Sequence, residues 1–481
     1  MYEICPDFLK QEDRIERVSL HKMCLLVNII AYMNNNFGTI KPGGDKIALL
    51  GIFVVALLTA YIIVVLKSAI VLSEPIKLAH TGLSVSIPTG NGWQSQKQWE
   101  YRDNAFTLHS NFAPVSGRPS AFANCQYILT ADITTPQMGL APGTPPQVWF
   151  EQKASEVEGT IVRTDQIQTN TLTIDWAHIH KPEILLNMFL GIAKLPYNRQ
   201  LNIGVHQIAV DAELAEQAFK DIVKSITFKD NLLRNGAEVI GQIKSKGLDS
   251  FLDNQNQQAF FLIQDSTRRT IGFTMDVLID SGIDNQFNIR AAGFFYIKGR
   301  YILEQGTSFQ SANNLSEYLW KSEIDSRTGR NGTEIILDKP GAMTVRKFGA
   351  QPQEKNYYLS PAAIPDVFLE QLLRQMLEDN KREMVVDIIE VNGKITPTFV
   401  SGLEVTKDMA IDEKIAYVLK LELLDGRGYT EQVYLNNQKR IYKRLVQQEN
   451  IYIFESTSIE NILREFPEQA EDILRRSKML K

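Results

Sequence analysis

Residues 363–379 read AIPDVFLEQLLRQMLED, and this stretch decides the architecture of the C-terminal half of the chain. Its spacing predicts a helix over 364–377, with Pro365 in the first turn and Asp366 at the positive N-terminal end. A wide apolar stripe runs along this helix, made of Ile364, Phe368, Leu369, Leu372, Leu373, Met376 and Leu377. A stripe this wide cannot face water, so we expect the concave face of a surrounding sheet to cover it.

Strand signals surround this helix and define a β-rich domain over 230–481. Residues 271–280 alternate strictly between apolar and smaller or polar side chains, which predicts a strand with one buried face. Further strands are expected near 259–264, 289–304, 334–337 and 343–348, with a polar loop at 326–334. Later hairpins turn at 392–393, 425–426 and 436–437. Thr457 and Glu460 predict a capping box that begins a final helix.

An N-terminal domain over 76–229 shows a different mixture of elements. Alternating residues predict strands near 83–87, 106–108, 125–131 and 172–176, and a hairpin over 186–208 that turns at 195–198. Helical spacing appears near 147–157 and 214–226. Both domains are therefore expected to be α+β with largely antiparallel sheets.

A membrane segment is predicted ahead of both domains. Residues 47–66 read IALLGIFVVALLTAYIIVVL and carry no charge. At about 1.5 Å per residue, this run spans the roughly 30 Å hydrocarbon core, so we expect a transmembrane helix over 47–67. A buried core helix is the alternative. The following KSAIVLSEP lacks a small-x-small cleavage site, which favours an uncleaved anchor.

The orientation of this anchor is inferred from cysteine placement, because the flanking lysines give a tie. Cys5 and Cys24 precede the anchor, and Cys125 alone follows it. This distribution favours a cytoplasmic N-terminus and an extracytoplasmic C-terminal part, periplasmic or equivalent. Residues 1–46 form an N-terminal tail, and translation from Met33 is an alternative start.

Composition excludes several classes of protein. The 481 residues include 51 Lys and Arg against 56 Asp and Glu, a net charge of −5, which is unlike a nucleic-acid binder. Three cysteines exclude a disulfide-stapled scaffold and a Cys-rich zinc module.

The best metal candidates are His178 and His180, whose i, i+2 spacing on a strand puts both on one side. Both histidines stand at even steps from Ile174 and Trp176 along the strand, so they extend the face that those residues turn to the core. On its own strand, His206 alternates with the apolar residues and is expected to face away from the core. A third ligand is not evident, and we expect no metal. No nucleophile, base and orienting group can be assembled, so no enzyme activity and no cofactor are expected.

A basic cluster of Lys439, Arg440, Lys443 and Arg444 lies on a predicted hairpin strand. We interpret it as a solvated edge guarded against aggregation. Contact with a partner or with lipid headgroups is the alternative.

Two family resemblances follow from these patterns. The opening GLSVSIP (82–88) with GW (92–93), the antiparallel meander and the closing AFKDIVKSITF (218–228) resemble the PsbP-like fold. Its members are typically exported or lumenal accessory proteins. YYLSPAAIPDVFLEQLL (357–373) and the hairpins after it resemble the LolA-like half-barrel group. That resemblance implies a half-barrel around a helix, where such proteins bind acyl chains or other apolar ligands.

These observations together predict a single-pass, membrane-anchored extracytoplasmic accessory or assembly protein that acts by binding to an envelope protein or lipid. The first alternative is a carrier of a lipid or other apolar ligand in the C-terminal half-barrel. Its lining would be Phe368, Leu369, Leu372, Leu373 and Met376. The second alternative is a metal-dependent enzyme that uses His178 and His180.

Overall fold

The computed structural model describes residue 56 and residues 71–90, 92–112, 121–130, 140–208, 212–251, 256–280, 286–297, 301–326, 329–339, 341–349, 352–405, 414–471 and 473–474. No helix among these residues is long and apolar enough to cross a membrane. The predicted anchor at 47–66 lies outside the described residues, apart from Ala56, as does the tail at 1–46. Residues from Ile70 onward form one compact unit, in which we distinguish a first lobe (71–229) and a second lobe (230–474).

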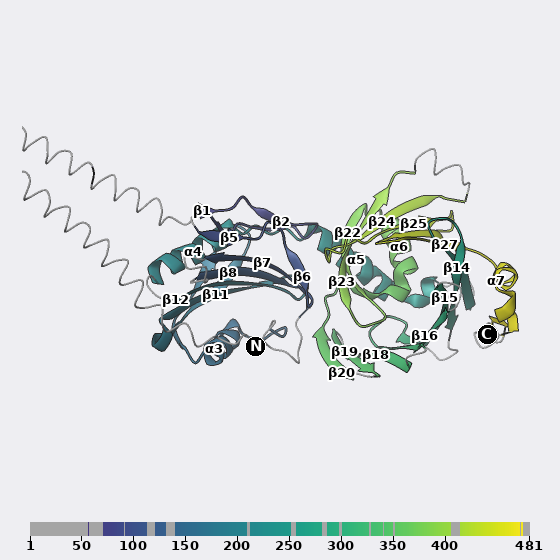
Figure 1. The fold of residues 1–481 in the computed structure, drawn as a ribbon, viewed down its shortest axis with the longest axis horizontal. Helices are drawn as coiled ribbons and strands as arrows, with labels where there is room; N and C mark the ends of the chain where they lie inside the picture. Colours follow the sequence, from purple (N-terminus) through teal and green to yellow (C-terminus); the bar gives the residue numbers. More distant parts are fainter. Residues whose placement is uncertain are drawn as a thin grey trace, which may run out of the picture. The chain divides into compact units, whose positions relative to one another are not determined.

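The first lobe is built on an eight-stranded antiparallel sheet in the order β5-β7-β8-β12-β11-β10-β9, with β6 paired to β7 (Figure 1). The bounds are β5 Trp93–Ser95, β6 Glu100–Arg102, β7 Ala105–Phe112, β8 Ala121–Ile128, β9 Thr160–Gln168, β10 Thr173–Lys181, β11 Leu186–Leu195 and β12 Arg199–Ile208. Two small sheets pair β1 Val71–Leu72 with β4 Pro88–Thr89 and β2 Ile76–Leu78 with β3 Leu83–Val85.

One helix covers each face of this sheet. The amphipathic helix α4 (Ala212–Ser225) buries Phe219, Ile222 and Val223 in the core that also holds Trp176 and Phe189. The helix α3 (Pro146–Glu156) buries Trp149 and Phe150 in a separate cluster on the other face. A short 3-10 helix, η3 (Pro182–Ile184), connects β10 to β11. The predicted α+β layout with an antiparallel sheet is confirmed.

The second lobe contains a fifteen-stranded sheet, in which each described neighbour is antiparallel except the β21–β22 pair. Its order is β20-β19-β18-β17-β16-β15-β14-β13-β27-β26-β25-β24-β23-β22-β21. The bounds are β13 Asn256–Gln264, β14 Thr270–Asp280, β15 Gln286–Ile297, β16 Tyr301–Ala312, β17 Tyr318–Ser326, β18 Gly329–Lys339, β19 Ala342–Phe348, β20 Gln353–Tyr358, β21 Ala363–Pro365, β22 Glu383–Ile389, β23 Ile395–Leu403, β24 Tyr417–Leu423, β25 Thr430–Leu435, β26 Ile441–Gln447 and β27 Ile451–Ser456.

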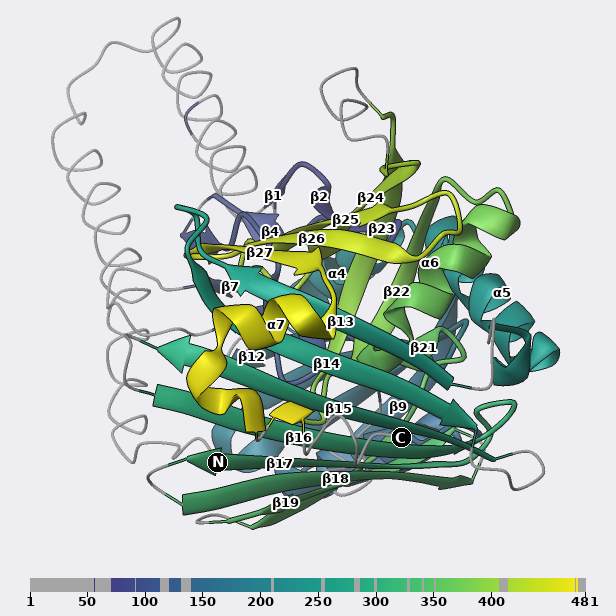
Figure 2. The ribbon, with the colours of Figure 1, turned by 90° about the vertical axis from the view of Figure 1, so that its right-hand side faces the viewer.

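Two helices fill the concave side of this sheet (Figures 1 and 2). These are α5 (Asn231–Lys246) and α6 (Leu369–Glu378), the latter preceded by the 3-10 helix η5 (Asp366–Phe368). Their apolar faces share one core with strand residues such as Phe309, Trp320 and Leu419. The expectation that a concave sheet covers the 364–377 stripe is therefore confirmed. The 3-10 helix η4 (Leu248–Phe251) follows α5.

A third helix, α7 (Ile459–Glu465), lies across the outer side of β13–β15 (Figure 2). Ile462 and Phe466 pack there against Phe273 and Met275 of β14. The 3-10 helix η6 (Pro467–Gln469) follows.

Several local predictions are wrong. The polar stretch predicted as a loop at 326–334 is mostly strand, because Ser326 ends β17 and residues 329–334 belong to β18. Ile364 and Pro365 belong to the short parallel strand β21, so α6 begins later than predicted. Ser458, and not Thr457, caps α7, because the Ser458 hydroxyl accepts a hydrogen bond from the backbone N–H of Asn461.

Helix α5 was not predicted at all. Its Leu233, Val239, Ile240 and Ile243 have helical spacing, but Gly236 and Gly241 interrupt the pattern. Gly236 is required because a Cβ there would lie 2.0 Å from the Val385 carbonyl oxygen on β22. Gly236 thus interrupts the helical pattern in the sequence, and it also allows α5 to pack closely against β22.

Candidate ligand site between the lobes

The two lobes meet around a buried ion pair. Arg199, the first residue of β12, directs one guanidinium nitrogen to both carboxylate oxygens of Asp387 on β22, at 2.7 Å each. The Arg199 and Asp387 side chains are 1% and 0% exposed. Arg199 also donates to the Leu129 carbonyl oxygen at 2.7 Å and lies over the Tyr127 ring. Burial alone would lower the pKa of Arg199, but the Asp387 carboxylate, together with Tyr127 and Tyr101, raises it.

Three further contacts join the lobes. The Tyr101 hydroxyl donates to the Ile395 carbonyl oxygen at 2.7 Å. The Asn198 side-chain amide donates to the Leu359 carbonyl oxygen at 2.8 Å. The His80 ring stacks on Phe399, with 3.7 Å between ring centroids. Polar contacts in different directions and an aromatic stack therefore hold the junction in one arrangement.

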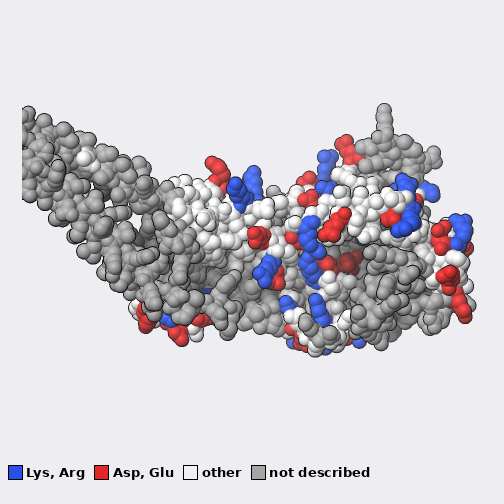
Figure 3. All heavy atoms as spheres, viewed as in Figure 1, with Lys and Arg blue, Asp and Glu red and all other residues white. Residues whose placement is uncertain are grey.

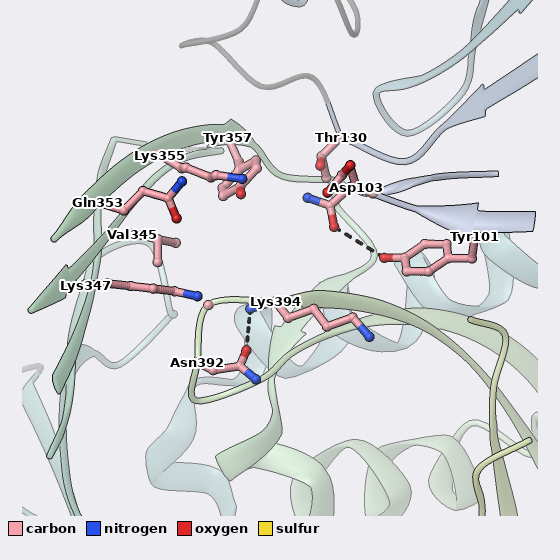
Figure 4. A pocket seen from close by; sticks show the side chains of 12 residues that line it. Tyr101, Asp103, Thr130, Val345, Lys347, Gln353, Lys355, Tyr357, Asn392 and Lys394 are labelled. Carbon is pink, nitrogen blue, oxygen red and sulfur yellow. Dashed lines mark hydrogen bonds between the residues drawn. The ribbon is translucent and has the colours of Figure 1, made fainter. Parts of the chain in front are cut away.

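A cavity of about 460 Å³ lies beside these contacts. Segments from both lobes line it: the β6–β7 turn and Thr130 from the first, and β19, β20 and the β22–β23 turn from the second (Figure 4). This volume falls in the range of small-molecule sites. The full lining is Tyr101, Asp103, Asn104, Thr130, Val345, Lys347, Gln353, Lys355, Tyr357, Asn392, Gly393 and Lys394.

The wall from the second lobe is one face of two paired strands. Val345 is directly opposite Lys355, and Lys347 is opposite Gln353, so all four side chains share that face. Lys347 and Lys355 extend from β19 and β20 toward the cavity (Figure 4). Tyr357 continues the same face and is buried.

The opposite wall belongs to the first lobe. The Tyr101 hydroxyl lies 3.3 Å from Asn104 Oδ1, and Thr130 is beside them (Figure 4). Thr130 is only 3% exposed, and its hydroxyl oxygen has no hydrogen-bond partner in the described part of the chain. Burial, with smaller contributions from Asp387 and Asp425, raises the pKa of Tyr101 well above its ordinary value, so its hydroxyl remains protonated.

The floor of the cavity is set by a tight turn. Gly393 has a φ of +80°, and a Cβ there would lie 2.3 Å from Val345 Cγ1. The next residue, Lys394, donates from its ammonium to Asp425 at 2.8 Å and lies over the Tyr101 ring. Burial alone would raise the pKa of Asp425, but hydrogen bonds from Lys394 and Arg427 lower it. Lys394 is thus neutralised within the structure.

The predicted metal candidates do not form a metal centre in the described residues. His178 Nε2 and His180 Nδ1 both bond to Asn187 Oδ1, at 3.0 and 3.1 Å. His178 stacks on the core residue Phe189, as its parity predicted. His206 lies on the other face of the sheet, against the ring of Phe122. No cluster of three potential ligands occurs among the residues that the structure describes.

The five proposed apolar-lining residues lie in the core of the second lobe. Phe368, Leu372, Leu373 and Met376 are fully buried, and Leu369 packs against the same cluster. The Phe368 ring meets Phe309 of β16 edge-on at 5.0 Å. None of the five lines the cavity between the lobes.

The basic cluster is not on a sheet edge, because β26 lies between β25 and β27. Its cations have acidic or aromatic partners instead. Arg440 pairs with Glu370 at 2.6 Å, Arg444 with Glu431 at 2.5 Å and Lys439 with Glu378 at 3.8 Å. The Lys443 ammonium lies over the Tyr434 ring. The interpretation as a solvated, guarding edge is therefore wrong.

Comparison with known proteins identifies no family. No protein-family model matches the chain, and no curated protein matches it. A β-barrel-like protein of the domain of unknown function DUF1849 from Brucella abortus aligns with 42% of this chain and 95% of its own, at 8% identity and a TM-score of 0.32. A DUF1089 family protein from Pseudomonas aeruginosa aligns with 35% of this chain and 87% of its own, at 11% identity and a TM-score of 0.22. Likenesses this distant carry no argument about function.

The sequence does not indicate the cavity. Its residues come from four separate stretches near positions 101, 130, 350 and 393, and none of these stretches carries a motif. Lys347 and Lys355 look like ordinary surface lysines in the sequence. A weak signal exists in their alternation with Val345 and Tyr357, which puts cations and apolar residues on one strand face.

Proposed function

We propose that this chain is a membrane-anchored extracytoplasmic accessory protein that acts by binding, without catalysis, and that its binding site is the cavity between the lobes. The joint construction of this cavity carries the proposal. Both lobes supply its walls, and the buried Arg199–Asp387 pair holds those walls together. A site of this kind is largely preformed, so little ordering is needed when a ligand binds.

The cellular setting of the proposal rests on the sequence. Residues 47–66 would anchor the protein, with the tail in the cytoplasm and both lobes outside it. We propose further that the first lobe is PsbP-like and that the second is a LolA-like half-barrel. The helix-covered antiparallel sheet of the first lobe and the strongly curved sheet around α6 in the second support these assignments.

A ligand-release experiment tests the site. The full-length protein is purified from membranes in a mild non-ionic detergent and heat-denatured, and the released small molecules are identified by mass spectrometry. Lys355→Trp places a bulky ring in the cavity, whereas Val162→Trp adds the same ring on β9, where Val162 is 59% exposed. We expect one ligand to be recovered with wild type and Val162→Trp, and to be lost with Lys355→Trp.

Gln353→Trp, on the same cavity face, serves as a second blocking variant, and circular dichroism establishes that each variant is folded. An unchanged set of released molecules in both folded blocking variants would refute the cavity as the binding site. Acyl chains that remain bound in both variants would instead locate binding in the half-barrel, as the carrier alternative predicts.

A further inference from the structure

We propose that the cavity between the lobes binds a small organic molecule through a phosphate group, which Lys347, Lys355 and the Thr130 hydroxyl hold. This inference rests on the proposed function, because it names the chemistry of a ligand for the same cavity. Three independent features support it: uncompensated charge on one wall, an unsatisfied buried hydroxyl on the other, and space for more than an inorganic ion.

The charge on the β19–β20 wall differs between its two faces. On the outer face, Arg346 pairs with Glu354 at 2.9 Å and with Glu334 at 3.7 Å. On the cavity face, Lys347 and Lys355 have no ion-pair partner among the described residues, and Lys355 is half-buried. On the face that Figure 3 draws, the acidic and basic side chains of the described residues are interspersed. Lys347 and Lys355 differ from other lysines without an ion-pair partner among the described residues in that both line the cavity.

The opposite wall contains a hydroxyl that has no hydrogen-bond acceptor within the part of the chain that the structure describes. A buried hydroxyl that makes no hydrogen bond costs about 1–3 kcal/mol, so such groups are rare in folded proteins. Among the described residues, the Thr130 hydroxyl is such a group, and Thr130 lies across the cavity from Lys355 and Tyr357 (Figure 4). A phosphate oxygen would accept from this hydroxyl. Asp103, on the same wall, is exposed and already pairs with Arg102 at 3.3 Å.

The number of charges favours phosphate over a carboxylate. A phosphate monoester carries about −1.5 to −2 charges at pH 7, which balances the two lysines, whereas a carboxylate carries only one. A phosphate also offers three acceptor oxygens, one for each ammonium group and one for the hydroxyl. The apolar part of the ligand would contact Val345 and Tyr357, which continue the lysine-bearing face.

Isothermal titration of the full-length protein in non-ionic detergent tests this proposal with phenyl phosphate, and with benzoate as a singly charged analogue. We expect phenyl phosphate to bind at least about tenfold more tightly than benzoate. Lys347→Gln with Lys355→Gln should weaken phenyl phosphate binding by about tenfold or more. The matched control, Lys224→Gln with Lys229→Gln, removes two exposed charges from the first lobe and should leave binding unchanged.

Thr130→Val separates a binding role from a structural one. The substitution keeps the shape of the side chain and removes only the unpartnered hydroxyl. We expect weaker phenyl phosphate binding, by about fivefold, and no loss in the free energy of unfolding. Unchanged binding in Thr130→Val and in the double lysine variant, or equal affinity for benzoate, would overturn the proposal.

Two further arms distinguish the source of the phosphate. Glycerol 1-phosphate represents a soluble phosphate monoester, and dihexanoyl phosphatidic acid represents a lipid headgroup that is also a monoester. The double lysine variant gives the baseline for partitioning of the lipid into micelles. Tighter binding of either probe identifies that source. If no phosphate probe binds but Lys355→Trp still loses the native ligand, the phosphate inference fails and the proposed function stands. If Lys355→Trp keeps the native ligand, the proposed function fails.

Discussion

At the scale of single residues, His206 shows how packing sets a protonation state. The ring lies on the face of β12 opposite the α4-covered core, edge-on to Phe122. Burial lowers the pKa of His206 to about 4, and the charge of Lys153 adds to the shift. The ring is therefore neutral in the folded protein over the whole physiological range.

This depressed pKa predicts an acid-dependent loss of stability. Between pH 6.5 and 4 the unfolded chain binds a proton at this position and the folded chain does not, so the free energy of unfolding falls as the pH falls. From pH 7 to pH 5 the loss reaches up to about 2 kcal/mol, and hydration of the half-buried ring reduces it. Urea unfolding at both pH values should show a smaller loss for His206→Phe than for wild type. An identical pH dependence in the two proteins would contradict this expectation.

For single residues, the sequence predicted correctly which face of a strand a side chain occupies. It did not predict contacts between segments that are distant in the sequence. The parity of His178 with Trp176 correctly placed its ring on the core face, and that of His206 correctly placed it opposite. Thr130 could not be found, because the lack of a hydrogen-bond partner among the described residues is a property of the folded surroundings. Lys347 and Lys355 could not be singled out either, because whether a lysine has an ion-pair partner among the described residues depends on the folded surroundings and not on the local sequence.

At the scale of elements, α5 offers a matched pair of glycines. A Cβ at Gly236 would overlap the Val385 carbonyl oxygen, whereas a Cβ at Gly241 would meet nothing within 4 Å. We expect Gly236→Ala to lower the free energy of unfolding by about 1–3 kcal/mol through forced separation of α5 and β22. Gly241→Ala should raise it by up to about 1 kcal/mol, because alanine is the better helix former. Urea unfolding measures both, and equal effects would show that α5 does not need the close approach.

Helix α6 gives a second test within one element. Leu372 is fully buried among strand residues, whereas Leu369 on the same helix is only partly buried. Leu372→Ala should cost about 2–5 kcal/mol of unfolding free energy, and Leu369→Ala clearly less. The same unfolding measurements decide this. A negligible cost for Leu372→Ala would indicate that the helix faces an open apolar cavity, as the carrier alternative requires.

Element prediction depended on uninterrupted periodicity. The α6 stripe and the alternation of β14 were clear in the sequence because the buried side chains recur at regular spacing, as Leu372 and Met376 do on α6 and Phe273 and Met275 do on β14. Helix α5 was not predicted because two glycines interrupt its apolar pattern. One of them, Gly236, is where the helix packs closely against the sheet. The polar β17–β18 hairpin resembled a loop because polar side chains such as Lys321 and Glu334 pair directly across it.

At the scale of the whole molecule, the Arg199–Asp387 pair couples the lobes. Asp387→Asn leaves the buried guanidinium without its charged partner and should cost about 3–5 kcal/mol. Replacing both residues, as Arg199→Met with Asp387→Leu, should recover much of this loss. Calorimetry of the full-length protein is expected to show one transition for the described unit in wild type and a separated first-lobe transition in Asp387→Asn. Equal stability of the single and double variants would argue against coupling through this pair.

The sequence predicted α+β structure in both halves and a change of pattern near residue 230. It did not predict that the halves would pack into one unit. That packing depends on a charged residue at the start of β12 meeting another in the middle of β22, 188 positions later. Neither the sequence around Arg199 nor the sequence around Asp387 indicates that the other residue is its partner.

The order of strands in the large sheet has a consequence for how the protein is made. β13, the first strand of that sheet in the chain, pairs with β27, the last, so Phe261 lies opposite Ser456. The ribosome synthesises the N-terminal segments first. Nearly 200 further residues are therefore synthesised after β13 before β27, its second neighbour in the sheet, is complete. During that interval its backbone is an open edge that can pair with other chains. The fold thus combines slow, non-local assembly with a need for protection of the nascent chain.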